Sequence, residues 1–193
     1  MSTIRFEADL SKIGSWTLLR LPKSASAQLP SRGMTMVDGT INGFPFQVPQ
    51  PLEPDGKGSH WLRVDEAMRE GAGAEPGDTV ILEIEPAKEW TEPQVPEDLK
   101  IALAADPQAQ TLWLDCSTVA RWDWIRWISA TAQQETRRRR IEVAFSKLKS
   151  GERRPCCFNR SMCTEPSVAK NGVLLEPAES RSRDMTTATY HRG

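Results

Sequence analysis

The stretch TVILEIEPAKEWTEPQVPEDLKIALAAD, residues 79–106, decides the fold because the spacing of its apolar side chains changes midway. In the first eight residues, Val80, Leu82 and Ile84 alternate with other side chains, as in a half-buried β-strand. Prolines then follow at three positions up to Pro96, where the chain cannot easily continue a strand. Beyond them the apolar residues recur at helical spacing, so the sequence predicts strands before this segment and helices after it.

The N-terminal part, residues 1–92, has the features of a small β-domain. The stretch TIRFEADL at residues 3–10 alternates apolar and mostly charged side chains, which predicts a strand. Asn42-Gly43 is typical of a hairpin turn, because both residues tolerate positive φ. Asp65 caps a predicted short helix that ends at glycine. We expect about six strands and two short helices here.

The remainder divides into a helical part and a tail. Residues 96–151 carry helical periodicity, and Gly151 is a predicted C-terminal cap. Residues 152–193 lose this periodicity and are rich in Arg, Ser, Thr, Glu and Pro, so we expect a poorly ordered tail. The sequence therefore predicts an α+β protein, with a β-domain, then a helical module, then a disordered segment.

Net charge and hydropathy bear on partners and location. The net charge is −1 in a chain of 193 residues, which gives no general attraction to nucleic acid or membranes. The two halves differ, with 9 basic and 14 acidic residues in 1–95 and 16 basic and 12 acidic residues in 96–193. No apolar run approaches the length of a membrane span or signal peptide, so we expect a cytoplasmic protein with reduced cysteines.

The four consecutive arginines from Arg137 to Arg140 raise the question of nucleic-acid binding. Successive helix residues are about 100° apart, so four of them sweep about 300° and cannot all face one phosphate backbone. At least one must lie near the packed face marked by Ile141, where its stem covers apolar surface and its head pairs with a carboxylate. This favours a solvated or salt-bridged helix over a nucleic-acid interface.

The stretch RWDWIRW, residues 121–127, concentrates aromatic side chains. Trp124 and Trp127 are three residues apart and share a helix face, whereas Trp122 points elsewhere. These rings could form an aromatic cage or stacking platform. Packing between helices is the favoured interpretation, because tryptophan buries a large area and needs only one donor satisfied.

The stretch PCCFNRSMC, residues 155–163, is the strongest chemical motif in the chain. Cys156, Cys157 and Cys163 could bind a soft metal or exchange disulfides, and neighbouring arginines would favour thiolates. Adjacent cysteines without a second ligand pair do not have the spacing of a structural zinc site. We favour an incidental cluster of reduced thiols and assign no metal.

No catalytic residue or cofactor is assigned from the sequence. It contains no GxSxG, P-loop, GxGxxG or HExxH motif. His60 could act as a general base only with a partner that the sequence does not locate, so a hydrogen-bonded structural role is favoured.

Two sets of motifs resemble known families. The stretches DGTINGFPFQV, GSHWLRVDEAMREGAGAEPGDTVILEIEP and PEDLKIAL resemble a bacterial barrel family of unknown function. The stretch RWDWIRWISATAQQETRRRRIEVAFSKLKSGERRP is similar to the helical region of bacteriocin-protection, YdeI/OmpD-associated proteins. In that family the two parts often occur together. The resemblance implies a small double-split β-barrel, related in shape to the AbrB/MazE group, followed by a C-terminal helical hairpin or bundle.

Three functions remain open on this basis. The first is a non-enzymatic bacterial protein that binds a small ligand or protein partner in stress or bacteriocin tolerance, at the junction of barrel and helices. The second is a DNA-binding transcriptional regulator with an AbrB-like barrel, although the acidic N-terminal half disfavours nucleic acid. The third is a thiol-redox or metal-binding protein. Barrels of this shape sometimes dimerise, so a homodimer is also considered. The binding residues that we predict for the first function are His60, Trp61, Trp124, Trp127, Arg137 and Arg140.

Overall fold

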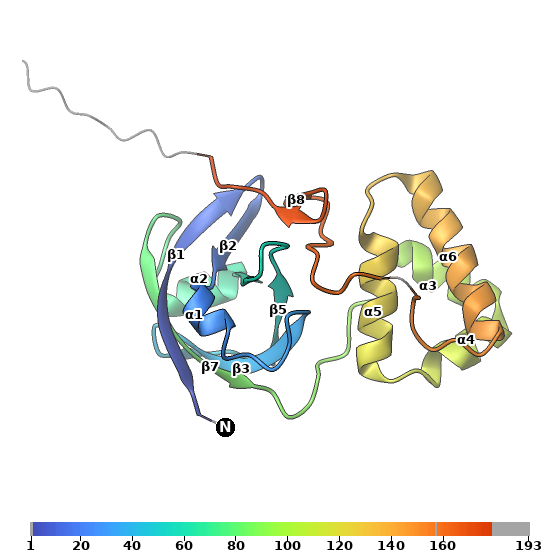
Figure 1. Cartoon of the computed structure of the whole chain (residues 1–193), viewed down its shortest axis with the longest axis horizontal. Coiled ribbons are helices and arrows are strands. Elements are labelled where there is room, and N and C mark those ends of the chain that lie inside the picture. Colours follow the sequence, from blue (N-terminus) through green and yellow to red (C-terminus); the bar gives the residue numbers. More distant parts are fainter. Residues whose placement is uncertain (1, 157, 179–193) are drawn as a thin grey trace, which may run out of the picture.

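A computed structural model describes residues 2–156 and 158–178. Seven strands and two short helices precede residue 87, and four longer helices lie between residues 97 and 149. Figure 1 shows the strands gathered on one side and helices α3 to α6 on the other. The predicted α+β class, a barrel followed by a helical module, is confirmed.

Six antiparallel strands close into the barrel, in the order β3-β5-β6-β2-β1-β7, with β7 pairing back onto β3. A short strand, β4, extends the sheet beyond β3. Closure leaves few unpaired edges, and this protects a small sheet from pairing with other chains. The bounds are β1 Ile4–Ile13, β2 Trp16–Arg20, β3 Thr35–Ile41, β4 Phe44–Pro45, β5 Gln50–Pro54, β6 His60–Arg63 and β7 Thr79–Pro86.

The alternation seen in the sequence determines which side chains face the barrel interior. In β1, Ile4, Phe6, Ala8 and Leu10 are buried, and the residues between them are exposed. The expected hairpin joins β3 to β4 through Asn42-Gly43, whose φ angles are 49° and 79°. These positive angles explain why this pair of residues occupies the turn.

Two short helices, α1 Lys23–Ser26 and α2 Glu66–Ala72, complete the barrel domain. Asp65 caps α2 by accepting a hydrogen bond from the Met68 amide at 2.8 Å. The helix ends at Gly73, whose φ of 61° is left-handed. The cap and the terminal glycine were both predicted from the sequence.

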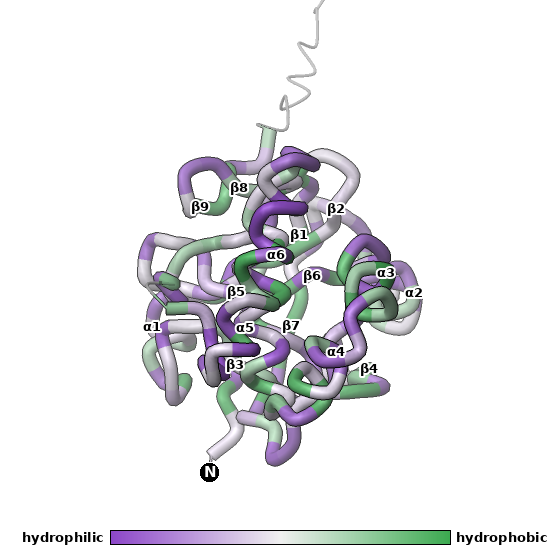
Figure 2. The backbone as a smooth tube through the Cα atoms, turned by 90° about the vertical axis from the view of Figure 1, so that its right-hand side faces the viewer, coloured by the Kyte–Doolittle hydropathy of each residue, from purple (hydrophilic) through white to green (hydrophobic). Residues whose placement is uncertain are grey.

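The four C-terminal helices are α3 Glu97–Ala105, α4 Pro107–Leu114, α5 Thr118–Ser129 and α6 Gln134–Lys149. They enclose a hydrophobic core of their own, separate from the barrel interior. Figure 2 looks from the helical side and shows α5 and α6 in front of the barrel strands. No helix in the described part of the chain has both the length and the hydropathy to span a membrane.

The segment after α6 differs from the expectation of a disordered tail beginning at residue 152. Residues 158–178, here called the strap, return from the helices to the barrel (Figure 1) and include a hairpin of β8 Ala169–Lys170 and β9 Val173–Leu174. The strap buries Cys163, Val168 and Leu174 against Trp61 on the outside of the barrel. The apolar residues that form this packing are few and follow neither helical nor strand spacing, so the sequence pattern did not indicate it. Residues 179–193 of the predicted tail lie outside the described residues.

Candidate functional site at the junction of barrel and helices

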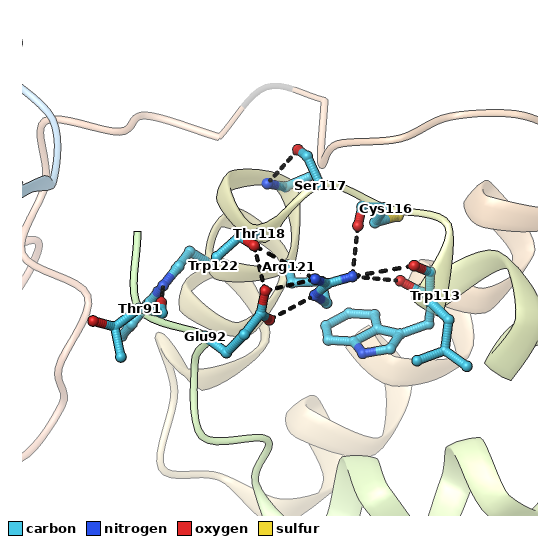
Figure 3. Close-up of polar contacts among 10 residues, drawn as sticks. Thr91, Glu92, Trp113, Cys116, Ser117, Thr118, Arg121 and Trp122 are labelled. Atoms are coloured by element: carbon cyan, nitrogen blue, oxygen red, sulfur yellow. Dashed lines mark hydrogen bonds and ion pairs between the residues drawn. The ribbon is translucent and has the colours of Figure 1, made fainter. Parts of the chain in front are cut away.

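The connector between the two domains is fixed by Arg121, near the start of α5 (Figure 3). Its Nε and Nη2 atoms donate to the two carboxylate oxygens of Glu92 at 3.0 and 2.8 Å. Its Nη1 atom donates to the carbonyl oxygen of Cys116 at 2.5 Å, after the end of α4. Hydrogen bonds from Arg121 and Thr118 lower the pKa of Glu92. Trp122 adds a hydrogen bond from its Nε1 atom to the carbonyl oxygen of Thr91 at 2.7 Å.

A second arginine of α5, Arg126, connects the helices, the barrel and the strap. Its side chain is 4% exposed, and its Nε atom lies 2.9 Å from Glu53 Oε2 on β5. Its Nη2 atom donates to the carbonyl oxygen of Met162 at 3.2 Å, and its guanidinium lies 5.3 Å from the ring centroid of Phe158. Burial raises the pKa of Glu53, and the charge of Arg126 opposes this shift. One buried ion pair therefore joins the two domains.

The strap is also held to α5 through Asp123. This carboxylate is buried and lies 2.9 Å from Arg160 Nη2 in the strap and 3.8 Å from Arg154 Nε. Burial raises the pKa of Asp123, and the neighbouring arginines offset part of that effect. Asp123, Arg126 and Trp127 are spaced three and four residues apart, so they occupy one face of α5. That face is the one along which the strap runs.

Where this face meets α6 and the strap, the surface forms a groove of about 260 Å³, here called the junction groove. Arg140 of α6 donates from Nη1 to the carbonyl oxygen of Trp127 at 2.7 Å. Its guanidinium carbon lies 5.5 Å from the Trp127 ring centroid, within the range of a cation–π contact. The lining residues are Trp127, Ala130, Arg140, Phe158, Asn159, Met162, Cys163, Thr164 and Gly172.

Of the six residues predicted to bind a ligand, the structure brings Trp127 and Arg140 together in this groove. Trp124 lies behind them, with no exposed surface, and packs edge-on against Trp127 at 6.0 Å between centroids. Its Nε1 atom donates to the carbonyl oxygen of Arg153 at 2.9 Å. Trp124 therefore supports the groove from the helical core, as the packing interpretation expected.

The arginine run is divided in the way that the helix geometry predicted. Arg137 donates to both carboxylate oxygens of Asp98 on α3, at 2.8 and 3.0 Å, and lowers the pKa of that carboxyl. Arg140 packs against Trp127, whereas Arg138 and Arg139 are exposed. The four side chains do not form one basic stripe, so this helix gives little support to DNA binding.

His60 and Trp61 on β6 do not line the junction groove. His60 has no exposed surface; its Nε2 atom lies 2.8 Å from the carbonyl oxygen of Gly33, and its Nδ1 atom 2.7 Å from Ser26 Oγ. A carbonyl oxygen can only accept, so Nε2 carries the proton and Nδ1 accepts from the hydroxyl. Trp61 is 2% exposed and packs beneath the strap, with its ring tilted by 55° to that of Trp16 at 6.1 Å between centroids. Both side chains are therefore buried parts of the protein's packing and are not exposed to a ligand in the groove.

The two described cysteines of the motif, Cys156 and Cys163, have different environments. Cys163 is buried behind the strap, where burial raises the pKa of its thiol to about 11. Cys156 is exposed, and its Sγ atom lies 3.0 Å from Lys147 Nζ. Cys157 lies outside the described residues. Among residues 2–156 and 158–178, no group of three or more His, Cys, Asp or Glu side chains is placed to hold a metal ion.

The sequence patterns did not indicate Glu53, Asp123, Arg126 or the strap as parts of the site. The sequence does hold a signal for two of them, because Asp123 and Arg126 are charged residues placed between tryptophans in the otherwise apolar stretch 122–127. Charged residues in such positions are rarely buried unless they are paired. Their partners were not readable, because Glu53 is 73 residues away and the strap lacks a periodic pattern.

Comparison with protein families matches both parts of the chain. Residues 6–84 match a domain of unknown function (DUF1905), and residues 92–151 match the family described as bacteriocin-protection, YdeI or OmpD-associated (OmdA). The suspected two-part arrangement is thus confirmed in its order. A comparison with curated proteins finds no match. Phe158 and the strap residues of the junction groove lie beyond both matched ranges.

Proposed function

We propose that this chain is a non-enzymatic binding protein that holds a small ligand in the junction groove. Support comes from the three elements that build the groove, since α5, α6 and the strap each contribute side chains to it. A concave site with aromatic and apolar walls and a few convergent polar groups is the usual form of a ligand site. Its volume of about 260 Å³ favours a small molecule over a folded partner.

The observation that carries the proposal is the position of Arg140 beside Trp127. Trp127 gives the ligand an apolar surface, and Arg140 retains donors beyond the one used for the Trp127 carbonyl oxygen. Arg126 fixes the opposite wall through its contacts with Met162 and Phe158. A site held by such buried contacts is preorganised and loses little freedom when a ligand enters.

The family matches support a setting for this function. One of the matching descriptions is bacteriocin protection, and we propose that ligand binding serves tolerance to bacteriocins or related stress in the bacterial cytoplasm. We also propose that the six-stranded barrel is of the double-split type and that helices α3 to α6 act as a bundle that presents the groove. The closed order of the six strands supports the barrel type, and the separate hydrophobic core of the helices supports the bundle.

Thermal unfolding of the full chain with a library of small metabolites tests the proposal. A ligand at 100 times its Kd stabilises the native state by about 2.7 kcal/mol. For a domain of this size, that raises Tm by about 5–10 °C. At least one compound should stabilise the wild type and the Arg139→Gln control, in which an exposed neighbour is changed. The same compound should not stabilise Trp127→Leu.

Two outcomes would contradict the proposal. Equal stabilisation of Trp127→Leu and the wild type would place the ligand elsewhere. No stabilisation by any compound, together with binding of a protein segment at the groove, would replace the small ligand by a macromolecular partner.

A further inference from the structure

We infer that the junction groove selects an anionic ligand, namely a small carboxylate with an aromatic or aliphatic body. This inference rests on the proposed function and adds the chemical class of the ligand. It follows from an asymmetry in the polar atoms that line the groove, in which donors are present and carboxylates are missing.

The donors come from α6 and the strap. The Arg140 guanidinium carries a full positive charge and uses one of its N–H groups, on Nη1, for the Trp127 carbonyl oxygen. The Asn159 Oδ1 atom accepts from the Ser161 amide at 3.0 Å, which leaves the Nδ2 amide group as a donor. The Thr164 hydroxyl can donate as well.

No Asp or Glu lines the groove, and no carboxylate within the described part of the chain pairs with Arg140. Glu53 is paired with Arg126, and Asp123 lies between Arg154 and Arg160. A guanidinium with unused donors beside an aromatic face suits a carboxylate, which accepts two parallel hydrogen bonds from it.

The rest of the lining selects the body of the ligand. Trp127, Phe158, Met162 and Ala130 present aromatic and aliphatic surface around the polar groups. The volume of about 260 Å³ lies below the common range of about 300–1,000 Å³ for drug-sized sites. The geometry therefore favours one ring or short chain attached to one carboxylate.

Calorimetric titration of the full chain with three matched probes tests the inference. Phenylacetate carries the predicted anion, phenylacetamide is its neutral counterpart, and phenethylamine is the cationic one. We expect phenylacetate to bind at least tenfold more tightly than phenylacetamide and phenethylamine not to bind. Indole-3-acetate and octanoate, which share the carboxylate, extend the test to a larger ring and to a chain.

Arg140→Gln should remove the preference for phenylacetate over phenylacetamide, whereas Arg139→Gln should retain it. Since Arg140 also binds the last turn of α5, Arg140→Lys serves as a second variant that keeps the charge and should retain part of the preference. Equal binding of phenylacetamide by the wild type overturns the anionic class and leaves the proposed binding function standing. If all three carboxylates fail to bind while a library compound stabilises the protein through Trp127, the class is likewise overturned. Failure of the carboxylates and of the whole library overturns both.

Discussion

His60 shows how one buried residue makes the stability of the barrel depend on pH. The side chain has no exposed surface, and its Nδ1 atom accepts from Ser26 Oγ in the neutral form. Burial lowers the pKa of His60 below its ordinary value of 6.5. The unfolded chain therefore takes up a proton at His60 before the native state does, so this stabilisation is complete above about pH 6.5 and declines as the pH falls below it.

Replacement of His60 by Gln should flatten this dependence. We expect the free energy of unfolding of the wild type to lose up to about 1.4 kcal/mol per pH unit more than that of His60→Gln between pH 6.5 and pH 5. Urea unfolding at several pH values measures the difference, and the subtraction cancels groups that titrate alike in both proteins. Parallel curves for the two proteins would show that His60 is protonated with the same pKa in both states.

For single residues, the sequence predicted which side chains are buried better than it predicted which side chains pair. Alternation in β1 placed Ile4 and Phe6 inside the barrel, because a strand repeats every two residues wherever it lies. Helix geometry likewise predicted that the arginine run would be divided. The pairing of Arg126 with Glu53 could not be predicted, because it depends on how a complete helical domain sits against a complete barrel. Local periodicity carries no information about that placement.

At the scale of elements, the strap is docked through a close approach of two backbones. Gly56 has φ 78°, and a Cβ atom built on it would lie 2.1 Å from the carbonyl oxygen of Gly172 in the strap. The Leu174 amide donates to the carbonyl oxygen of Asp55 at 2.9 Å, so this approach is part of a hydrogen-bonded contact. The helical and strand elements were predicted from periodicity, but a contact between two backbones has no periodic pattern, and the sequence shows only glycines at the two positions, Gly56 and Gly172.

Gly56→Ala should therefore release the strap. Gly14 supplies a matched control, since its φ is 58° and a Cβ atom there would meet nothing within 4 Å. Gly14→Ala should cost about 1–2 kcal/mol from the left-handed backbone alone. Gly56→Ala should cost more and should expose the strap to limited proteolysis at residues 158–178. Equal cost in the two variants, with the strap still protected, would contradict this account of docking.

At the scale of the whole molecule, the barrel and the helices have separate cores, and the buried ion pair of Arg126 with Glu53 links them. A buried ion pair adds little net stability, but loss of one partner leaves an uncompensated charge. Arg126→Met should therefore reduce the free energy of unfolding by about 3–5 kcal/mol at neutral pH. The double variant Glu53→Gln with Arg126→Met should recover much of this loss, because no buried charge remains.

The pH dependence separates this mechanism from a simple loss of packing. Burial raises the pKa of Glu53, so the native state holds its proton more tightly than the unfolded chain does. The stability associated with this group is complete below the unfolded pKa and is lost as the pH rises through the folded one. Without Arg126 the folded pKa rises further, so Arg126→Met should be much less stable at pH 8 than at pH 5.5. Urea unfolding of both variants at these two pH values measures the effect. If the single and double variants were equally destabilised at both pH values, the loss would come from side-chain packing alone. The charge of Glu53 would then have no part in joining the domains.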